Sequence, residues 1–415
     1  MYNHAKYHEG KKKLIGVVVP ALELGGGVPS VADFVCRTIE RSDAFEYRLI
    51  SLATSARDDI SVGLTRPTTW MHGVRTCQQT WQGRPITRVG AFASELEFQR
   101  YNPRYALAEL LKDCDLIQVV CGSPAWAWSV CGLGKPVAVQ CATRAIVERR
   151  RRDVMSRGWK DEWRRWMTHF TDRLECKALQ SVDAIQVENP WMLDYAQGIN
   201  KGRDAIIRYA PPGVDAMLYR PAANRDLQVA PYILCVGRLD DPRKNIGLLL
   251  DAYSCMPVEF RETVRLVLAG LAGPGPTFWS RVKELGLIDR VEFVSSPDSA
   301  TLIRLYQGAA VFALSSDEEG LGVVILEAMA CGVPIVSTRC GGPEGIIMDG
   351  KDGFLVGLDD VKAMADRLSL LLSDEALNRC MGVAARETIL KRYETGVAGQ
   401  AFLDIFDELF TMGIS

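Results

Sequence analysis

The chain has 415 residues, more than one ordinary hydrophobic core organises, so two domains are expected. Hydrophobic residues make up 48% of the chain and charged residues 24%, a balance that excludes a disordered or fibrous protein. The formal net charge of −2 gives no overall attraction to nucleic acid or anionic lipid, so any such binding has to come from a local patch.

The twelve cysteines are scattered singly, and only four histidines accompany them. This pattern argues against a zinc site and against a disulfide framework, and it favours a reducing compartment. The first apolar run, residues 14–19, is too short for a signal-peptide core or a membrane span. We therefore expect a cytoplasmic protein without a metal, with the inner face of the membrane as an alternative location.

Short β-branched runs alternate with amphipathic segments along the whole chain, which predicts an α/β fold with doubly wound parallel sheets. The pattern occurs twice, so we expect two Rossmann-like domains that face a cleft. The predicted strands of the first half are residues 14–19, 47–52, 115–120, 136–140 and 183–188. Those of the second half are residues 232–236, 264–269, 291–294, 310–314, 334–337 and 354–356.

A glycine-rich segment, PALELGGGV, follows the first predicted strand and leads into a helix. The backbone amides of Gly26 and Gly27 are therefore candidates for contact with a diphosphate. The segment lacks the G-x-G-x-x-G pattern of dinucleotide sites, and a plain flexible turn is the alternative.

A basic segment rich in tryptophan, residues 144–177, contains eleven Lys or Arg against six Asp or Glu. As a helix it would place Trp159, Trp163 and Trp166 on one stripe, with Arg164 and Arg165 beside it. Tryptophan next to arginine is typical of a helix at a membrane interface, so we expect contact with an anionic membrane surface or with an acceptor carrying a lipid phosphate. The alternative is a stripe that faces the core.

Prolines and a glycine in residues 209–224 prevent a helix or a central strand there and predict the connection between the domains. The first domain is then predicted at residues 1–210. The second domain is predicted at residues 211–394. An amphipathic helix within residues 395–415 would complete the first domain.

Basic side chains follow the first strand of the second half. Arg238, Arg243 and Lys244 lie between this strand and the next helix, where they could neutralise a diphosphate. Fixed cations there would stabilise the charge on a departing nucleoside diphosphate without a metal. The alternative is a solvated basic loop.

The segment SSDEEGLGVVILEAMACGVPIV leaves a later strand through a loop with two glycines and enters a helix. A helix that starts near Gly322 offers free N–H groups to a phosphate, and Gly320 lets the backbone approach a ligand closely. Glu319 and Glu327 would then accept hydrogen bonds from sugar hydroxyls. The alternative is that Glu319 caps the helix and Glu327 is an ordinary helical residue.

Together these segments resemble the retaining nucleotide-sugar glycosyltransferases grouped as family 4, which have the GT-B fold. The signature of that family is two glutamates separated by seven residues, the spacing of Glu319 and Glu327. The similarity extends to GRLDDPRKN, PPGVDAMLYRP, GGPE followed by DGKDGFLV, and SVDAIQVENPWM. It covers nearly all of the second half and, more loosely, the first. It implies that the first domain lies on the acceptor side and that the second domain binds the donor.

The resemblance implies a hexosyltransferase of polysaccharide biosynthesis that moves a sugar from a UDP- or GDP-sugar to a glycan or lipid-linked acceptor. The nucleotide sugar is a co-substrate, so no cofactor, metal or nucleic acid is implied. Glu319 would contact the transferred sugar and act with Arg238 and Lys244 in catalysis. The donor-binding set is Gly26, Gly27, Arg238, Arg243, Lys244, Glu319, Gly320, Leu321, Gly322 and Glu327, with Glu327 at the ribose.

Two departures from the family pattern leave alternatives open. Lys244 lies six residues after Arg238 where many relatives have five, so Arg243 is a rival for the second cation. The first-domain histidine that the family often places near the sugar is missing, because residues 140–143 read Gln-Cys-Ala-Thr. A nucleotide-sugar-binding protein with weak or no transferase activity, or a nucleotide-sugar epimerase of the same fold, therefore remains an alternative.

Overall fold

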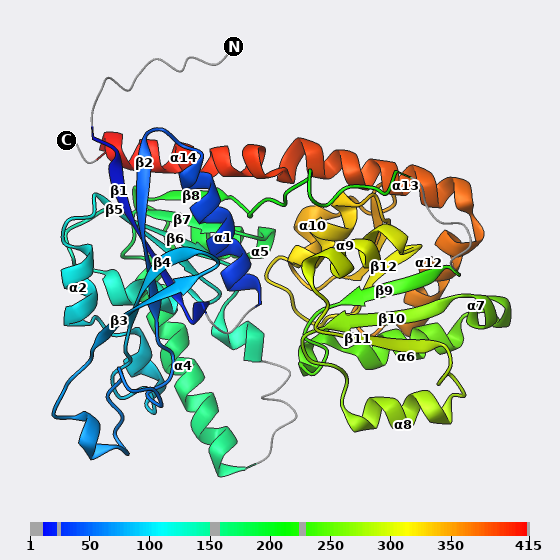
Figure 1. The fold of residues 1–415 in the computed structure, drawn as a ribbon, viewed down its shortest axis with the longest axis horizontal. Helices are drawn as coiled ribbons and strands as arrows, with labels where there is room; N and C mark the ends of the chain where they lie inside the picture. The colour runs from blue at the N-terminus through cyan, green and yellow to red at the C-terminus, as the bar shows by residue number, and fades with distance from the viewer. Residues whose placement is uncertain (1–10, 23–25, 150–157, 224–229, 413–415) are drawn as a thin grey trace. The chain divides into compact units, whose positions relative to one another are not determined.

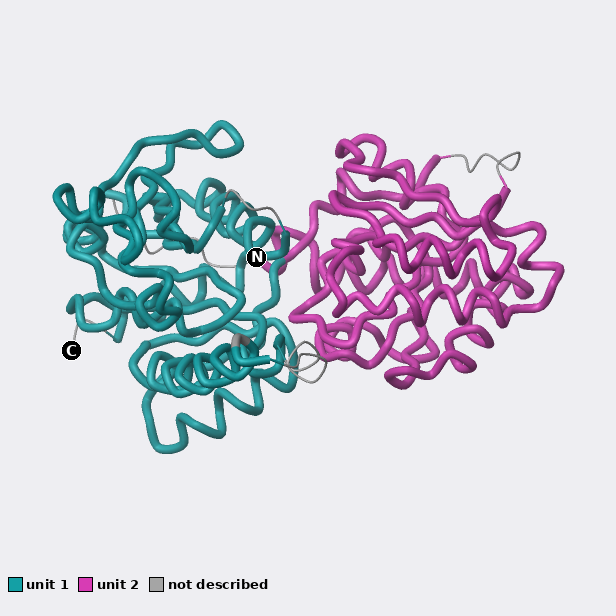
Figure 2. Tube along the Cα trace, turned by 90° about the horizontal axis from the view of Figure 1, so that it is seen from below, with its two compact units in different colours: residues 1–212, 399–415 teal, residues 213–398 magenta. Residues whose placement is uncertain are grey.

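The computed structural model describes residues 11–22, 26–149, 158–223 and 230–412. The chain divides into two compact units, coloured separately in Figure 2. Unit 1 comprises residues 1–212 and 399–415, and unit 2 comprises residues 213–398. Each unit is built on a sheet with helices around it, so the predicted α/β class with two parallel-sheet domains is confirmed.

Unit 1 contains an eight-stranded sheet in the order β3-β4-β2-β1-β5-β6-β7-β8 (Figure 1). All neighbouring strands in it are parallel except β3 and β4. Its strands are β1 (Lys13–Pro20), β2 (Phe45–Leu52), β3 (Thr76–Trp81), β4 (Arg84–Val89), β5 (Leu116–Cys121), β6 (Val137–Cys141), β7 (Ala184–Val187) and β8 (Ile206–Tyr209). Its helices are α1 (Gly27–Glu40), η2 (Pro67–Thr69), η3 (Glu97–Tyr101), α2 (Tyr105–Leu111), η4 (Pro124–Val130), α4 (Trp159–Leu179) and α5 (Pro190–Ile199).

Unit 2 contains a six-stranded, fully parallel sheet in the order β11-β10-β9-β12-β13-β14. Its strands are β9 (Tyr232–Val236), β10 (Arg265–Gly270), β11 (Val291–Ser295), β12 (Val311–Leu314), β13 (Ile335–Thr338) and β14 (Gly353–Val356). Its helices are η5 (Pro242–Lys244), α6 (Ile246–Cys255), α7 (Val258–Thr263), α8 (Pro276–Glu284), α9 (Ser299–Gly308), α10 (Val323–Ala330), α11 (Pro343–Ile346), α12 (Val361–Ser373), α13 (Glu375–Thr388) and η6 (Ile389–Tyr393).

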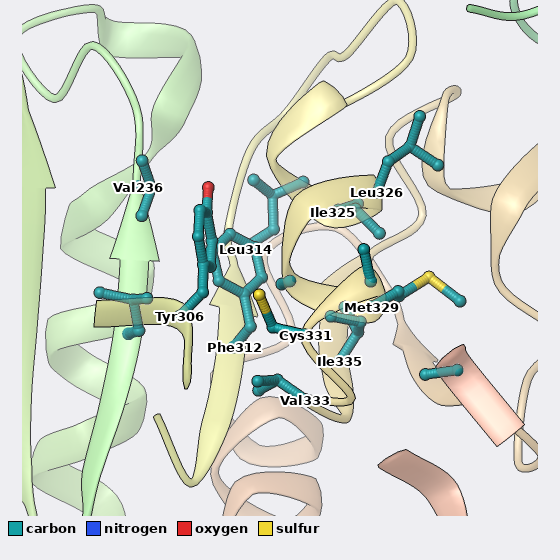
Figure 3. Close-up of a cluster of buried hydrophobic side chains, with 14 of the residues drawn as sticks. Val236, Tyr306, Phe312, Leu314, Ile325, Leu326, Met329, Cys331, Val333 and Ile335 are labelled. Carbon is teal, nitrogen blue, oxygen red and sulfur yellow. The ribbon is translucent and has the colours of Figure 1, made fainter. Parts of the chain in front are cut away.

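Helices cover both faces of the unit 2 sheet, because successive side chains of a strand point to opposite faces. Leu234 and Phe312 belong to one buried cluster, whereas their neighbours Ile233 and Val311 belong to another. Figure 3 shows part of the first cluster, in which side chains of β9 and β12 gather with those of helix α10. The helix that carries Glu327 is therefore fixed to the sheet by apolar packing.

All eleven predicted strands are present, but three further strands of unit 1 were not predicted. Strands β3 and β4 form a hairpin whose two turn residues, Gln82 and Gly83, both have positive φ. A two-residue turn ending in glycine between β-branched and aromatic residues is a sequence signal for such a hairpin, and we missed it. Strand β8 lies at the edge of the sheet and has only four residues. So short a strand shows little alternation of apolar and polar residues in the sequence.

The last helix, α14 (Thr395–Met412), starts in unit 2 and ends in unit 1. Within unit 1, Phe402 packs edge-on against Phe34 of α1 with ring centroids 5.3 Å apart. Phe406 packs in the same way against Phe45 at the start of β2, at 5.8 Å. The end of α14 is thus part of the core of unit 1. The acceptor and donor roles of the two units stay predictions.

Among the described residues, none of the helices combines the length and the apolar character that crossing a bilayer requires.

Candidate active site

The candidate site in unit 2 lies at the point where the strand order of its sheet reverses. From β9 the chain proceeds outward on one side through β10 and β11, and β12 then returns to the other side of β9. Ligands of open α/β sheets bind outside the carboxyl ends of the strands at such a point. The loops that follow β9 and β12 carry Arg238 to Lys244 and Ser315 to Gly322, so the topology brings the two predicted segments together.

Backbone contacts hold the loop after β12 in place. Gly322 has a φ of 86° and is the N-cap of α10, so the helix starts where the sequence predicted. The N–H of Glu319 donates to the Cys340 carbonyl at 2.9 Å, and a Cβ on Gly342 would lie 2.3 Å from the Leu321 carbonyl oxygen. The loops after β12 and β13 therefore approach more closely than a side chain would allow.

The carboxylate of Glu319 is held by a cation and a hydroxyl. Its Oε1 atom lies 2.6 Å from Nζ of Lys244 and accepts a 2.6 Å hydrogen bond from the Ser316 hydroxyl. The side chains of both Lys244 and Glu319 are largely buried, with 17% and 11% exposed. Glu319 makes no capping hydrogen bond to α10, so the capping alternative is wrong. A fixed ion pair at a helix N-terminus suits a ligand with hydroxyls and a phosphate.

The two remaining cations have different surroundings. Arg243 pairs with Asp241 at 2.7 Å and with Glu318 at 3.0 Å. Arg238 is 55% exposed, and its guanidinium lies 3.6 Å from the carboxylate of Asp241. A ligand can therefore bind Arg238 with little loss of ion pairing, whereas Arg243 would have to leave two carboxylates. Of the rivals for the second cation, the structure brings Lys244 to Glu319.

Glu327 lies on α10 and its carboxylate is part-buried. The hydroxyl of Tyr306, on helix α9, donates to Oε2 of Glu327 at 2.6 Å. Burial raises the pKa of Glu327, while hydrogen bonds from Tyr306 and Tyr219 oppose that shift. Figure 3 shows the ring of Tyr306 within the apolar cluster, so a fully buried ring aims the hydroxyl. Glu327 is therefore more firmly held than an ordinary helical glutamate.

Four residues that support this site escaped the sequence analysis: Ser316, Tyr306, Tyr219 and Asn245. Asn245 adopts a left-handed conformation and donates from its amide to Asp317 at 2.8 Å, which joins the loops after β9 and β12. A non-glycine residue with positive φ is a mark of a constrained loop. No local sequence pattern signals Tyr306 or Tyr219, because their contacts with Glu327 arise only on folding.

In the described part of the chain, no group of three or more His, Cys, Asp or Glu side chains is arranged to hold a metal ion.

Comparison with known proteins shows what the segment that carries this site is similar to. Residues 223–388 match the model of the family described as glycosyl transferases group 1. This segment is therefore similar to the group 1 glycosyltransferases. The family match covers most of unit 2, which we call the group 1 domain, and with it both glutamates and all three cations.

Among curated proteins, the chain is 32% identical over 222 residues to the GDP-mannose-dependent alpha-(1-6)-phosphatidylinositol monomannoside mannosyltransferase of Mycolicibacterium smegmatis. That match covers 49% of this chain and 57% of the relative. The chain spans about half the length of the curated relatives it matches.

Two solved structures share the fold over almost the whole chain. Sucrose-phosphate synthase from Thermosynechococcus elongatus has a TM-score of 0.72 at 20% identity. The match covers 97% of this chain and 100% of the synthase chain. Anabaena HepE in complex with UDP-glucose has a TM-score of 0.66 at 16% identity and covers 95% of this chain and 99% of its own. Both units together thus have the GT-B arrangement of elements along the chain.

In unit 1 the predicted phosphate-contacting glycines lie at the equivalent position after β1. Gly26 has a φ of 99° and is the N-cap of α1, of which Gly27 is the first residue. A Cβ on either glycine would meet no atom within 4 Å, so the backbone there is open. The strand order of this sheet also reverses next to β1, which puts Gly26 at a ligand-binding edge. Their contact with a donor stays a prediction.

The stretch that lacks the family's histidine is occupied by buried polar groups. Gln140, on β6, donates a hydrogen bond to the carboxylate of Glu188, which follows β7, and both side chains are buried. The amide of Asn189 donates to the Ala142 carbonyl at 2.6 Å. Burial raises the pKa of Glu188 to about 7. The stretch where the family often has a histidine thus contacts a buried carboxyl group with a raised pKa.

This buried carboxyl predicts a pH dependence of stability. Because the pKa of Glu188 is raised on folding, the folded chain binds a proton that the unfolded chain releases between the two pKa values. The free energy of unfolding therefore falls as the pH rises from about 4.5 to about 7, by up to about 1.4 kcal/mol per pH unit, and this contribution levels off above pH 7. Glu188→Gln should raise the melting temperature at pH 8 and change it little at pH 5.

Thermal melts from pH 5 to pH 8 would check this prediction, with Glu46→Gln on β2 as a control. Glu46 is exposed, so its replacement should change the melting temperature little at any pH. Parallel curves for Glu188→Gln and the parent chain would contradict a neutral Glu188 in the folded state. Part of the slope should remain in the variant, because burial also raises the pKa of Glu175 to about 7.

The tryptophan segment forms α4, which begins at Trp159, while residues 150–157 lie outside the described residues. Trp159, Trp163 and Trp166 are all more than half exposed, so the alternative of a stripe facing the core is wrong. Arg164 pairs with Asp161 at 3.0 Å, and Arg165 pairs with Glu162. The structure therefore places the tryptophans on the surface but neutralises both of the arginines predicted to act with them.

Proposed function

We propose that the chain is a hexosyltransferase that moves a sugar from a UDP- or GDP-sugar to a glycan or lipid-linked saccharide acceptor, with retention of anomeric configuration and without a metal. The observation that carries the proposal is the Lys244–Glu319 ion pair at the N-terminus of α10, with an exposed Arg238 in the loop that also carries Lys244. A lipid-linked acceptor would bring the chain to the inner face of the membrane.

The chemistry needs charge stabilisation at the leaving group. The bond between the anomeric carbon and the diphosphate oxygen breaks, and a new bond forms from the acceptor hydroxyl oxygen to the same carbon. The proton of that hydroxyl passes to the departing phosphate oxygen, so no separate base is required. Arg238 and Lys244 would stabilise the negative charge that develops on the diphosphate. They could therefore perform the role that a divalent cation has in other transferases.

The carboxylates would orient the sugar and the nucleotide. Glu319 can accept hydrogen bonds from two hydroxyls of the transferred sugar, because Lys244 and Ser316 both contact its Oε1 atom and, among the described residues, Oε2 has no hydrogen-bond partner. Glu327 would accept from the ribose hydroxyls if the ligand replaces one of its tyrosine donors. The Mycolicibacterium smegmatis relative is a GDP-mannose-dependent phosphatidylinositol monomannoside mannosyltransferase, which supports a GDP-sugar and a lipid-linked acceptor. HepE was solved with UDP-glucose, so we propose both kinds of donor.

A second candidate is a nucleotide-sugar-binding protein with weak or no transferase activity. The observation that favours it is the stretch from Gln140 to Thr143, where buried amide and carboxyl groups stand in place of the histidine that the family often has. The proposed donor site is the same in both cases, so only turnover separates the two.

A thermal-shift screen with UDP, GDP, ADP and CMP, followed by their sugars, would test the proposal. A nucleotide present at 100 times its Kd stabilises the native state by about 2.7 kcal/mol, or roughly 5–10 °C for a unit of this size. The nucleotide that gives the largest shift then defines the donors for a product assay. No shift with any nucleotide would contradict both candidates, and a shift without transfer or donor hydrolysis would favour the second.

A further inference from the structure

An unusual row of exposed aromatic side chains lies along helix α4. Trp159, Trp163, Trp166 and Phe170 are 76%, 53%, 65% and 46% exposed. Their spacings of four, three and four residues place them on one side of the helix, which we call the aromatic face. Large aromatic residues that gather on a surface mark a contact with another molecule, since soluble proteins otherwise bury them.

The aromatic face is not needed to attach α4 to unit 1. The opposite side of the helix packs against η4, and its Met167, Thr171 and Glu175 are buried. Glu175 accepts hydrogen bonds from the Ser123 hydroxyl at 2.5 Å and from the Ala145 N–H at 2.9 Å. In Figure 1 the first turns of α4 extend away from the sheet of unit 1. The aromatic face can therefore meet a partner while the helix stays anchored.

Positive charge continues the aromatic face toward the end of the helix. Arg173 and Lys177 follow Phe170 at steps of three and four residues, and both are exposed. Within the described ranges no salt bridge to either is found, whereas Arg164 and Arg165 pair with acidic residues one turn earlier. The acidic residues of this half of the helix do not compete, because Asp172 pairs with Arg144 and Glu175 is buried.

We propose that the aromatic face, with Arg173 and Lys177, docks unit 1 on an anionic phospholipid surface. Tryptophan prefers the boundary between lipid headgroups and acyl chains, because its ring is largely apolar and its N–H can bond to a headgroup. The two cations at the end of the same face are complementary to lipid phosphates. The inference deepens the proposed function, on which it rests, by assigning the surface through which a lipid-linked acceptor is reached.

The tryptophans and the two cations of α4 are expected to contribute to binding in different ways. The tryptophans supply apolar insertion, which is insensitive to salt, and only two cations supply attraction to phosphate. We therefore expect binding to anionic vesicles to weaken only modestly as the salt concentration rises. Substitution of the tryptophans should reduce binding to anionic and neutral vesicles alike. Reversal of the two charges should reduce binding to anionic vesicles alone.

Co-sedimentation of the full chain with vesicles of phosphatidylcholine, with and without 30% phosphatidylglycerol, tests the proposal. The double variant Trp163→Ser and Trp166→Ser should bind anionic vesicles at least about tenfold more weakly than the parent chain. The double variant Arg173→Glu and Lys177→Glu should bind them about tenfold more weakly. The control is Trp70→Ser, since Trp70 is also an exposed tryptophan of unit 1, at 57%, but lies outside α4. It should bind like the parent chain.

Several results would overturn the proposal. They are the absence of vesicle binding by the parent chain, equal loss in the Trp70 control, and self-association that the double tryptophan variant abolishes without any vesicle binding. Melting temperatures of each variant show whether it is folded. The screen with UDP and GDP separates this test from the proposed function, because the double tryptophan variant should retain the nucleotide shift of the parent chain. Vesicle binding without a nucleotide shift would support the docking surface and contradict the proposed transferase function.

Discussion

Replacement of Glu319 by glutamine is expected to lower transfer at least about 100-fold in kcat/KM, or about 2.7 kcal/mol of transition-state stabilisation. The amide keeps the shape of the side chain but removes the negative charge that lies 2.6 Å from Nζ of Lys244. Lys244 then no longer has a fixed position, and the sugar loses a charged hydrogen-bond acceptor. Steady-state kinetics with the donor identified by the nucleotide screen would measure the loss.

The neighbouring carboxylate offers a matched control for that variant. Glu318 is as buried as Glu319, at 11% exposed, and is also paired with a cation, since it lies 3.0 Å from Arg243. Glu319→Gln leaves Lys244 without its carboxylate, and Glu318→Gln removes one of the two carboxylates that pair with Arg243, so both should lower stability, by up to about 1–3 kcal/mol. Only Glu319→Gln should also lower transfer by two orders of magnitude. Equal losses of activity in the two variants would show that Glu319 acts through the fold of the loop.

Substitution of Arg238 by alanine is expected to lower kcat by about 100-fold or more while the donor Kd rises far less. The reason is that the diphosphate gains its extra charge only as the glycosidic bond breaks, so a guanidinium beside it favours the transition state over the bound donor. The side chain is 55% exposed with a single distant carboxylate, so the fold should lose little stability. Kinetics and calorimetric titration of the donor would give kcat and Kd separately.

Arg243→Ala is the informative comparison for Arg238, because the sequence left Arg243 as a rival cation. Its guanidinium pairs with Asp241 and Glu318, so its loss should lower the melting temperature and affect kcat much less than Arg238→Ala. Equal changes in kcat and Kd for Arg238→Ala would exclude it from transition-state stabilisation. A larger loss of kcat in Arg243→Ala would move that role to Arg243.

The fold was predictable because its signals are local. The strands of the group 1 domain are short apolar runs bounded by glycine, proline or a change of period, and every one of them was predicted. The start of α10 at Gly322 was predictable for the same reason, since a glycine before a helix-forming run marks a boundary. The hairpin of β3 and β4 was missed although its Gln82-Gly83 turn carried a signal.

The site was only partly predictable. The spacing of Glu319 and Glu327 identified the donor segments, and the strand order then placed both segments at one edge of the sheet. The choice between Lys244 and Arg243 needed three dimensions, because adjacent residues in a loop point in different directions and no sequence rule says which one meets a carboxylate 75 residues away. The hydrogen bond from the Tyr306 hydroxyl to Glu327 could not be predicted either, because helix α9 has no sequence motif that indicates it.

By itself the sequence determined the α/β class, the repetition of a parallel-sheet pattern in the two halves and the segments that carry the donor site, because hydrophobic period and motif spacing are properties of the chain. Only the tertiary structure decided that Lys244 is the partner of Glu319 and that the tryptophans of α4 face outward. An aromatic stripe at helical spacing has the same sequence whether it packs inward or meets solvent. What distinguishes the two is which side of the helix the rest of unit 1 covers, and that depends on residues distant along the chain.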